Sequence, residues 1–222
     1  MTKAVVITAG GRGHRIGAPV PKQFIKLVDQ PILALTIQKF HDYDSSMQIV
    51  VTLPEDEMER WNQIQKEIHF GIEHEVVAGG VNRFESVKNG LEKVSADLVA
   101  VHDGVRPFVS QEVIDNCFCK AESDGSAIPV MSMTNSIRQV DGDTSKSINR
   151  SDFRTVQTPQ VFQTPELKRA YDQDYSPEFT DDASVFEADG GTVHLVDGNV
   201  ENIKITTPLD LKIAKLLSTT NN

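Results

Sequence analysis

The sequence predicts a single α/β domain built on a doubly wound, mostly parallel sheet, with one arm projecting from it. Apolar runs alternate with amphipathic segments through residues 3–131, and such alternation of strands and helices is typical of parallel βαβ units. The chain has 222 residues. A domain of this length buries roughly 70–75% of the surface that its unfolded chain exposes. We therefore expect one sizeable core and one domain over residues 1–222.

The elements are expected in a regular order. Short apolar runs predict strands at 3–8, 47–53, 74–78, 98–102 and 126–131. Amphipathic segments predict helices at 31–42, 55–68, 82–94 and 110–123. In the second of these helices, Met58, Trp61 and Ile64 follow one another at intervals of three residues. That spacing places them on one helical face, which favours a helix packed on the sheet.

The regular order breaks at residues 132–156. This segment has short β-like pieces around the polar turn "DGDTSKS" and almost no apolar face, which predicts an arm projecting from the core. Composition alone also allows a plain solvated hairpin. Order returns at Thr164-Pro165 and Thr207-Pro208, where a hydroxyl residue before a proline predicts an N-cap and a helix start.

Composition excludes several classes of partner. The formal net charge is −10, whereas nucleic acids and anionic membranes favour proteins with a broad basic surface. No apolar run approaches the ~20 residues of a membrane span, and the apolar run after Lys3 is too short for a signal peptide. Cys117 and Cys119 lack the spacing of a metal site or a disulfide framework. We expect free thiols and a cytoplasmic protein.

The stretch "AGGRGHRIG", residues 9–17, follows the first strand. In open α/β sheets, ligands bind beyond the carboxyl ends of the strands, and a glycine-rich turn there lets backbone N–H groups approach a phosphate. Two common versions of such a loop do not fit. A Walker loop needs a Gly-Lys-Ser/Thr ending, and a dinucleotide fingerprint needs a small residue where Ile16 stands and an acid near residues 33–37, which read "LALTI".

The loop carries its own positive charges. Arg15 lies within it, and Lys22 follows in "PKQF" after two prolines that stiffen the approach. Phosphoryl transfer requires mainly positioning and electrostatic stabilisation from a protein. These two cations are therefore candidates for balancing the charge on a pentacoordinate phosphorus, while Arg12 is explained equally well as a solvated charge.

The stretch "HDGVRP", residues 102–107, ends the strand predicted at 98–102. Asp103 is a candidate Mg²⁺ ligand, because Mg²⁺ binds through one or two carboxylates together with substrate phosphates. A turn-forming role for its side chain is an equally good interpretation of this motif alone. Gly104 would let a ribose approach the backbone, and His102 is interpreted as a buried residue with satisfied hydrogen bonds.

Three further motifs lie downstream. Gly79-Gly80 lead into a helix that carries Ser86, which is either a site residue or an ordinary surface serine. "TDDAS", residues 180–184, is typical of a helix N-terminus with acids in its first turn. Lys204 in "NIKIT" is less ordinary, because a lysine at the inner end of an apolar strand requires an anion nearby.

Taken together in order and spacing, these stretches resemble one family. "AGGRGHRIG" with "PKQF", "GG..R..SV", "HDGVRP", an arginine eight residues before "TPQ", "TDDAS" and "NIKIT" are similar to 2-C-methyl-D-erythritol 4-phosphate cytidylyltransferases of the non-mevalonate isoprenoid pathway. The resemblance runs from residue 3 to about residue 217. It implies a Rossmann-like, glycosyltransferase-A-like nucleotidyltransferase fold and transfer of a cytidylyl group from CTP.

The resemblance also implies roles for particular residues. Arg15 and Lys22 match the catalytic cations that stabilise the transition state as the substrate phosphate attacks the α-phosphorus of CTP. The residues that match the family's nucleotide site are Ala9, Gly10, Gly11, Gly13, Gly80, Ser86, Asp103 and Gly104. Asp103 would also hold Mg²⁺. The residues that match the site of the polyol phosphate are Arg106, Ser136, Arg150, Thr158, Thr180 and Lys204.

The same resemblance changes the interpretation of the arm at 132–156. In the family the arm exchanges between two chains of a homodimer and carries an arginine, here Arg150, into the partner's site. An acidic protein would in this way gather enough positive charge for two anionic ligands. The expected partners are therefore CTP, a polyol phosphate and a second copy of the chain.

Three alternatives stay open from the sequence. Ribitol 5-phosphate cytidylyltransferases share the glycine loop, "PKQF" and the stretch around Lys204, but "TDDAS" and "NRSDFRTVQTPQVF" favour methylerythritol phosphate. A catalytically silent nucleotide-binding protein would have no need of both Arg15 and Lys22. A nucleotidyltransferase for a sugar 1-phosphate would share the loop, yet it does not account for the double glycine, "TDDAS" and the arm together.

Overall fold

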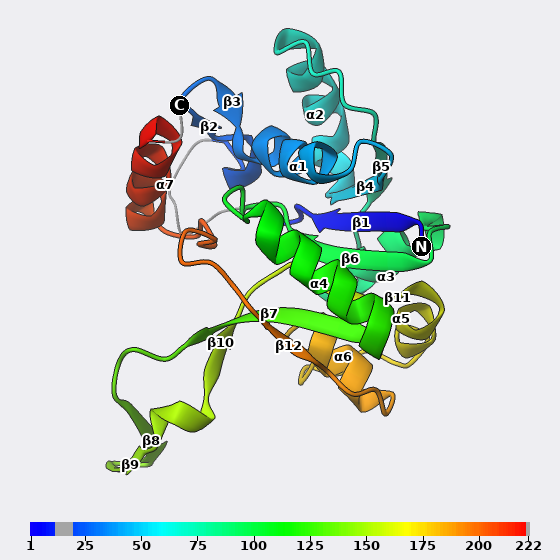
Figure 1. The fold of residues 1–222 in the computed structure, drawn as a ribbon. Coiled ribbons are helices and arrows are strands. Elements are labelled where there is room, and N and C mark those ends of the chain that lie inside the picture. The colour runs from blue at the N-terminus through cyan, green and yellow to red at the C-terminus, as the bar shows by residue number, and fades with distance from the viewer. Residues whose placement is uncertain (12–19, 221–222) are drawn as a thin grey trace.

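The structure of the protein is a computed structural model that describes residues 1–11 and 20–220. Its centre is an eight-stranded sheet with helices on both faces (Figure 1). The strands of this sheet are β1 (Lys3–Thr8), β4 (Gln48–Leu53), β5 (Glu75–Ala78), β6 (Leu98–Asp103), β7 (Ser126–Ser132), β10 (Arg154–Val156), β11 (Gln160–Gln163) and β12 (Leu195–Asp197). The α-helices are α1 (Ile32–Tyr43), α2 (Glu55–Glu67), α3 (Arg83–Lys93), α4 (Gln111–Asp124), α5 (Thr164–Ala170), α6 (Asp182–Ala188) and α7 (Pro208–Thr220). No helix of this described part is long and apolar enough to cross a membrane.

The parallel half of the sheet confirms the expected βαβ order. β6, β1, β4 and β5 lie side by side in that order and run parallel. Along β1, Val5 and Ile7 face the apolar layer beneath α1, α2 and α4, whereas Ala4 and Val6 face the layer beneath α3, α5 and α6. The chain moves from β1 to β4 and β5 on one side and returns to β6 on the other. The sheet therefore has its topological switch point between β1 and β6, where such folds bind ligands.

Two strands depart from the parallel pattern, and one of them, β10, is antiparallel to β7 at the edge of the sheet. β11 lies between β6 and β7 and is antiparallel to both. The sequence predicts no strand there, because the four residues of β11 are too few to show a periodicity. An antiparallel neighbour needs no helical crossover, so the chain can return from the arm straight into the space between β6 and β7.

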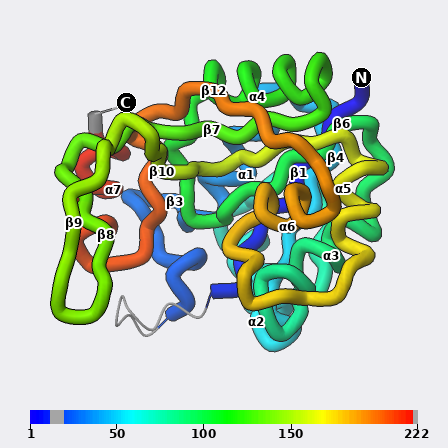
Figure 2. Tube along the Cα trace, turned by 90° about the horizontal axis from the view of Figure 1, so that it is seen from below, coloured from blue at the N-terminus to red at the C-terminus, as the bar shows by residue number. Residues whose placement is uncertain are grey.

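The arm contains a hairpin of β8 (Ile137–Asp141) and β9 (Thr144–Ile148), whose turn includes Gly142 at a φ of 55°. It stands away from the sheet in both views (Figures 1 and 2). Most of its residues are exposed, including Val140 at 72%. The projecting arm expected at 132–156 is therefore present, and its hairpin is largely open to solvent within one chain.

The C-terminal elements agree only in part with expectation. At α7 the Thr207 hydroxyl accepts a hydrogen bond from the Asp210 N–H at 3.2 Å, which confirms Thr207 as the N-cap. At α5 a helix starts at Thr164-Pro165 as expected, but the N-cap assignment was wrong, because Thr164 is the first helical residue and Gln163 is the N-cap. The segment around Lys204 is extended but forms no strand, and Ile205 donates one backbone hydrogen bond to Val105 at 3.0 Å.

A short two-stranded sheet of β2 (Lys26–Leu27) and β3 (Gln30–Pro31) follows the 3-10 turn η1 (Lys22–Phe24) and leads into α1.

Cys117 is buried in the core and Cys119 is exposed, and both are free thiols as expected.

Candidate active site

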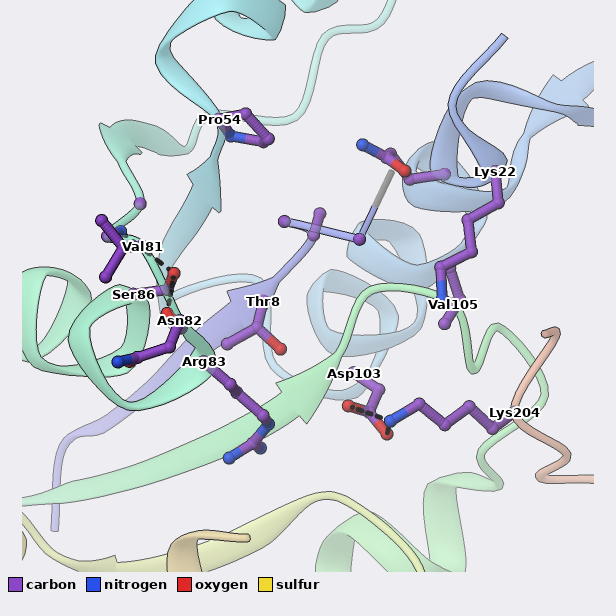
Figure 3. A pocket seen from close by; sticks show the side chains of 16 residues that line it. Thr8, Lys22, Pro54, Val81, Asn82, Arg83, Ser86, Asp103, Val105 and Lys204 are labelled. Atoms are coloured by element: carbon purple, nitrogen blue, oxygen red, sulfur yellow. Dashed lines mark hydrogen bonds and ion pairs between the residues drawn. The ribbon is translucent and has the colours of Figure 1, made fainter. Parts of the chain in front are cut away.

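A cavity of about 430 Å³ lies at the carboxyl ends of β6, β1, β4 and β5, beside the topological switch point. Each of these strands contributes the residue at its end or the residues directly after it. The lining residues are Thr8, Ala9, Gly10, Gly11, Lys22, Gln23, Pro54, Gly79, Gly80, Val81, Asn82, Arg83, Ser86, Asp103, Val105 and Lys204. Ser86, Asn82 and Val81 form one side of the cavity, and Lys22, Asp103 and Lys204 form the other (Figure 3). The cavity thus gathers motifs from across the whole chain.

Lys22 is held against the glycine loop by the 3-10 turn η1. Phe24 donates a backbone hydrogen bond to Pro21 at 2.9 Å, which closes this turn directly after the proline. A Cβ atom on Gly11 would lie 2.9 Å from Cε of Lys22 and 3.2 Å from its Nζ. Glycine at position 11 therefore lets the Lys22 ammonium lie against the backbone. Gly13 and Arg15, like Arg12, are outside the described residues.

Ser86 lies in the first turn of α3 and faces the turn that connects β5 to this helix. Its hydroxyl donates to the Asn82 carbonyl at 2.8 Å and accepts from the Gly80 N–H at 3.1 Å. Asn82 caps α3 by accepting from the Glu85 N–H at 2.8 Å. Ser86 is therefore a buried part of the cavity wall, and the alternative of an ordinary surface serine was wrong. Gly10 approaches it from β1, since a Cβ there would lie 4.0 Å from the Ser86 hydroxyl oxygen.

Asp103 ends β6 and carries the negative charge of the cavity. Its carboxylate accepts from Nε of Arg106 at 2.9 Å and contacts Nζ of Lys204 at 3.1 and 3.2 Å. Burial alone would raise the pKa of Asp103, but the charges of Lys204, Arg83 and Arg106 hold it well below its usual range. The carboxylate is therefore ionised, and it pairs with cations rather than forming a turn with its own backbone.

Lys204 and Arg106 reach Asp103 from different directions. Arg106 lies three residues along the chain, and it also donates to the Asn202 carbonyl at 2.7 Å. Lys204 follows Asn202 in the extended segment before α7. The anion that the sequence analysis required for Lys204 is thus Asp103. Gly104 continues from β6, with its N–H bonded to the Thr8 carbonyl at 2.9 Å.

Below the cavity, His102 forms a closed hydrogen-bond network. Its Nε2 donates to the Arg106 carbonyl at 3.1 Å, and its Nδ1 accepts from the Thr158 hydroxyl at 3.0 Å. The same hydroxyl accepts from the Asp103 N–H at 3.1 Å. Burial lowers the pKa of His102 to about 4, so the ring is neutral. The interpretation of His102 as a satisfied buried residue is confirmed, and the Thr158 hydroxyl is already engaged with its neighbours.

Arg83 is the arginine of the motif "GG..R..SV", and the sequence alone suggests no role for it. Its guanidinium forms a two-pronged ion pair with Asp182, at 2.8 and 2.6 Å, and Asp182 is fully buried. The Tyr171 hydroxyl donates to the same carboxylate at 2.6 Å. Although burial alone would lower the pKa of Arg83, the charge of Asp182 raises it. Both partners stand in motifs of the sequence, Arg83 in "GG..R" and Asp182 in "TDDAS". No local pattern shows that the two motifs pair.

Six of the predicted site residues that the structure describes are not among those that line this cavity. Gly104, Arg106 and Thr158 adjoin it, because each is hydrogen-bonded to the lining residue Thr8 or Asp103.

The other three are Ser136, Arg150 and Thr180. Ser136 and Arg150 belong to the arm, where both are exposed, and Arg150 donates to the Thr134 carbonyl. Thr180 directly precedes Asp181, the N-cap of α6. Ser136 and Arg150 are therefore carried by the arm and not by the strand ends that build the cavity.

The residues present suit a Mg²⁺ ion bound together with a ligand rather than a cage made by the protein. Asp103 is the one carboxylate among the described residues that line the cavity. Within the described ranges no group of three or more His, Cys, Asp and Glu side chains could hold a metal. One ionised carboxylate fits Mg²⁺, which takes its other ligands from phosphates and water.

Comparison with known proteins agrees with the motifs. The model of the family described as 2-C-methyl-D-erythritol 4-phosphate cytidylyltransferase matches residues 3–219. A relative of that name from Bacteroides thetaiotaomicron is 49% identical over 218 residues, 98% of this chain and 100% of the relative. One from Porphyromonas gingivalis is 49% identical over 216 residues, 96% of each chain.

Solved structures give the same result. The crystal structure of 2-C-methyl-D-erythritol 4-phosphate cytidylyltransferase from Thermus thermophilus has a TM-score of 0.81 and 31% identity, covering 99% of this chain and 100% of that one. The 4-diphosphocytidyl-2C-methyl-D-erythritol synthase of Anaerococcus prevotii has a TM-score of 0.84 and 25% identity, covering 98% and 96%.

Proposed function

The chain belongs to the 2-C-methyl-D-erythritol 4-phosphate cytidylyltransferase family, and we propose that the cavity beside Lys22, Ser86 and Asp103 is its active site. The reaction transfers the cytidylyl group of CTP to 2-C-methyl-D-erythritol 4-phosphate and releases pyrophosphate. The product is 4-diphosphocytidyl-2-C-methyl-D-erythritol, an isoprenoid precursor. The observation that carries the assignment is the match over residues 3–219, whose motifs converge on one cavity.

The glycine loop and Lys22 would serve the triphosphate. An oxygen of the substrate phosphate attacks the α-phosphorus, and the bond between that phosphorus and the oxygen bridging to the β-phosphate breaks as pyrophosphate leaves. Negative charge gathers on the phosphoryl oxygens in the transition state, so a fixed cation beside them accelerates the reaction. Lys22 lies against Gly11 in the cavity wall, which supports this role for its ammonium. Arg15 is proposed to act with it.

The other end of the cavity would hold the nucleoside. Ala9, Gly10, Gly80 and Ser86 line this end and are proposed to contact the base. Gly104 and Asp103 follow on the neighbouring strand, near the expected place of the ribose. Asp103 would hold Mg²⁺, which when bound neutralises part of the charge of the triphosphate.

The polyol phosphate is proposed to bind where Lys204 and Arg106 meet Asp103. Lys204 retains access to solvent, with 42% of its side chain exposed. Thr158 and Thr180 stay candidates for this end of the site. Ser136 and Arg150 would complete it only from the arm of a second chain, which supports a homodimer with exchanged arms. The expected location of the enzyme is the cytoplasm.

The deciding experiment is pyrophosphate release from CTP and Mg²⁺ with two acceptors assayed in parallel. Turnover with 2-C-methyl-D-erythritol 4-phosphate alone is the expected result. Turnover with ribitol 5-phosphate instead would keep the fold and the chemistry but change the substrate. CTP binding without turnover of either acceptor would indicate a nucleotide-binding protein that does not catalyse the transfer.

A further inference from the structure

Gln23 is a buried polar residue at the cavity that has no hydrogen-bond partner for its side chain among the described residues. This side chain is 1% exposed, and neither its Nε2 nor its Oε1 bonds to any other part of the described protein. Gln23 nevertheless lines the cavity, together with Lys22, Gly11 and Pro54. A buried amide with both ends unpaired destabilises a fold, because its lost hydrogen bonds to water are not replaced. A binding role would explain why a polar residue stands at this position.

The backbone that carries Gln23 is firmly anchored. Its neighbour Phe24 stacks on Trp61, with ring centroids 5.9 Å apart and planes 8° apart. Trp61 is fully buried and donates from its indole N–H to Nε2 of His74 at 3.0 Å. Because the turn is fixed on one side by this aromatic stack and closed by the Phe24–Pro21 hydrogen bond, the Gln23 backbone cannot simply swing its amide into solvent.

The chemistry of an amide restricts what it can bind. Nε2 donates and Oε1 accepts, so a single ligand group satisfies both ends if it accepts and donates at once. Phosphate oxygens of an ionised triphosphate only accept. A nucleoside offers both functions, either on the base edge, where cytosine pairs an acceptor N3 with a donor amino group, or on a ribose hydroxyl.

We propose that Gln23 is a nucleoside-binding residue of this site, pairing its free amide with the base edge or a ribose hydroxyl of the nucleotide. The inference rests on the proposed function, because it takes a nucleotide as the ligand of the cavity. No protein group in the described ranges fixes which way the amide faces, so it can turn to match either cytosine or uracil. Gln23 therefore contributes affinity for the nucleoside and does not by itself choose the base.

The test uses Gln23→Met, which keeps the length of the side chain and removes both polar ends. Calorimetric titrations of CTP and of tripolyphosphate, with and without Mg²⁺, are made on the wild type and the variant. We expect the affinity for CTP to fall by roughly 10- to 100-fold, since a nucleoside group loses its partner. The affinity for tripolyphosphate should stay within about twofold, because Lys22 and the glycine loop are unchanged.

A second readout separates binding from a structural role. The urea midpoint of Gln23→Met should equal or exceed that of the wild type, because the variant removes a buried unpaired amide. Weaker CTP binding by a protein that is no less stable is the expected signature. Gln23→Leu serves in the same way if the methionine variant does not fold.

Titration with dCTP separates a contact with the 2′-hydroxyl from the other possible contacts. If the amide binds the 2′-hydroxyl, the affinity for dCTP is the same in Gln23→Met as in the wild type. If it binds the base or the 3′-hydroxyl, the variant loses as much affinity for dCTP and UTP as for CTP. Unchanged CTP affinity in a folded variant, or an equal loss for tripolyphosphate, would overturn the inference. Failure of the wild type to bind CTP at all would instead count against the proposed function.

Discussion

The ammonium of Lys204 contacts both carboxylate oxygens of Asp103, at 3.1 and 3.2 Å, although the two residues are 101 positions apart in the chain. Asp103 is nearly buried at the end of a central strand, whereas Lys204 keeps 42% of its side chain exposed. One end of this ion pair is therefore fixed by the sheet, and the other faces the place where a second ligand would enter. Lys204 can hold Asp103 and still direct an N–H toward an anion.

Lys204→Met should impair use of the polyol phosphate more than binding of CTP. A hydrogen bond to a charged group is worth about 1.5–3 kcal/mol, so we expect kcat/KM for the acceptor to fall by roughly 10- to 100-fold. Steady-state kinetics with each substrate varied in turn measure this. Lys212→Met, which removes an exposed lysine of α7, is the matched control. An equal rise in KM for both substrates would show that Lys204 acts on the whole site through Asp103.

Lys22→Ala should fold normally and lose about 10²–10³ in kcat, which is the usual cost of removing one preorganised group that stabilises transition-state charge. The Lys22 side chain lies in the space beside Gly11, so shortening it to alanine creates no clash. Pyrophosphate release measures the rate, and circular dichroism with urea unfolding checks the fold. Lys26→Ala provides the control, since Lys26 is exposed four residues further on. Near-normal turnover in Lys22→Ala would remove this residue from the mechanism.

Mixing two inactive variants tests whether the arm acts on a neighbouring chain. Arg150 lies on the arm and Lys22 lies in the cavity, so exchanged arms would put an intact Arg150 beside an intact Lys22 in half of the sites of a mixed dimer. Arg150→Ala and Lys22→Ala, unfolded and refolded together, should regain part of the activity that each lacks alone. Stable mixed dimers that recover nothing would show that each chain uses its own arginine.

The parts of this fold with a strong local period could be predicted from the sequence, and the parts made by long-range contacts could not. In the strand ending at Thr8 and in the helix carrying Trp61, the pattern of apolar residues is visible within a dozen residues. β11 is too short for that, and its place is decided by where the arm returns. In the site, the glycine loop and Asp103 were identified from local motifs. The pairing of Arg83 with Asp182 joins segments 99 residues apart and becomes visible only when α3 and α6 pack.

His102 should make the protein less stable as the pH falls from about 6.5 to about 4. The unfolded chain binds a proton at this histidine below about pH 6.5, whereas burial keeps the folded ring neutral down to about pH 4. The unfolded state therefore holds more protons in this window, and the free energy of unfolding decreases with acidity by at most about 3 kcal/mol. Asp103 keeps its charge there, because its pKa is low.

Urea unfolding at pH 7, 5.5 and 4 measures this slope. His102→Asn tests its origin, because the amide oxygen can replace Nδ1 as the acceptor for Thr158 and the side chain does not titrate. We expect the variant to lose stability more gently with acidity than the wild type. Some slope should remain, since burial also lowers the pKa of His74, and protonation there would break the hydrogen bond from Trp61. His69→Asn, at an exposed position, should leave the wild-type slope unchanged. An identical slope in His102→Asn and the wild type would mean that the neutral His102 ring contributes nothing to acid sensitivity.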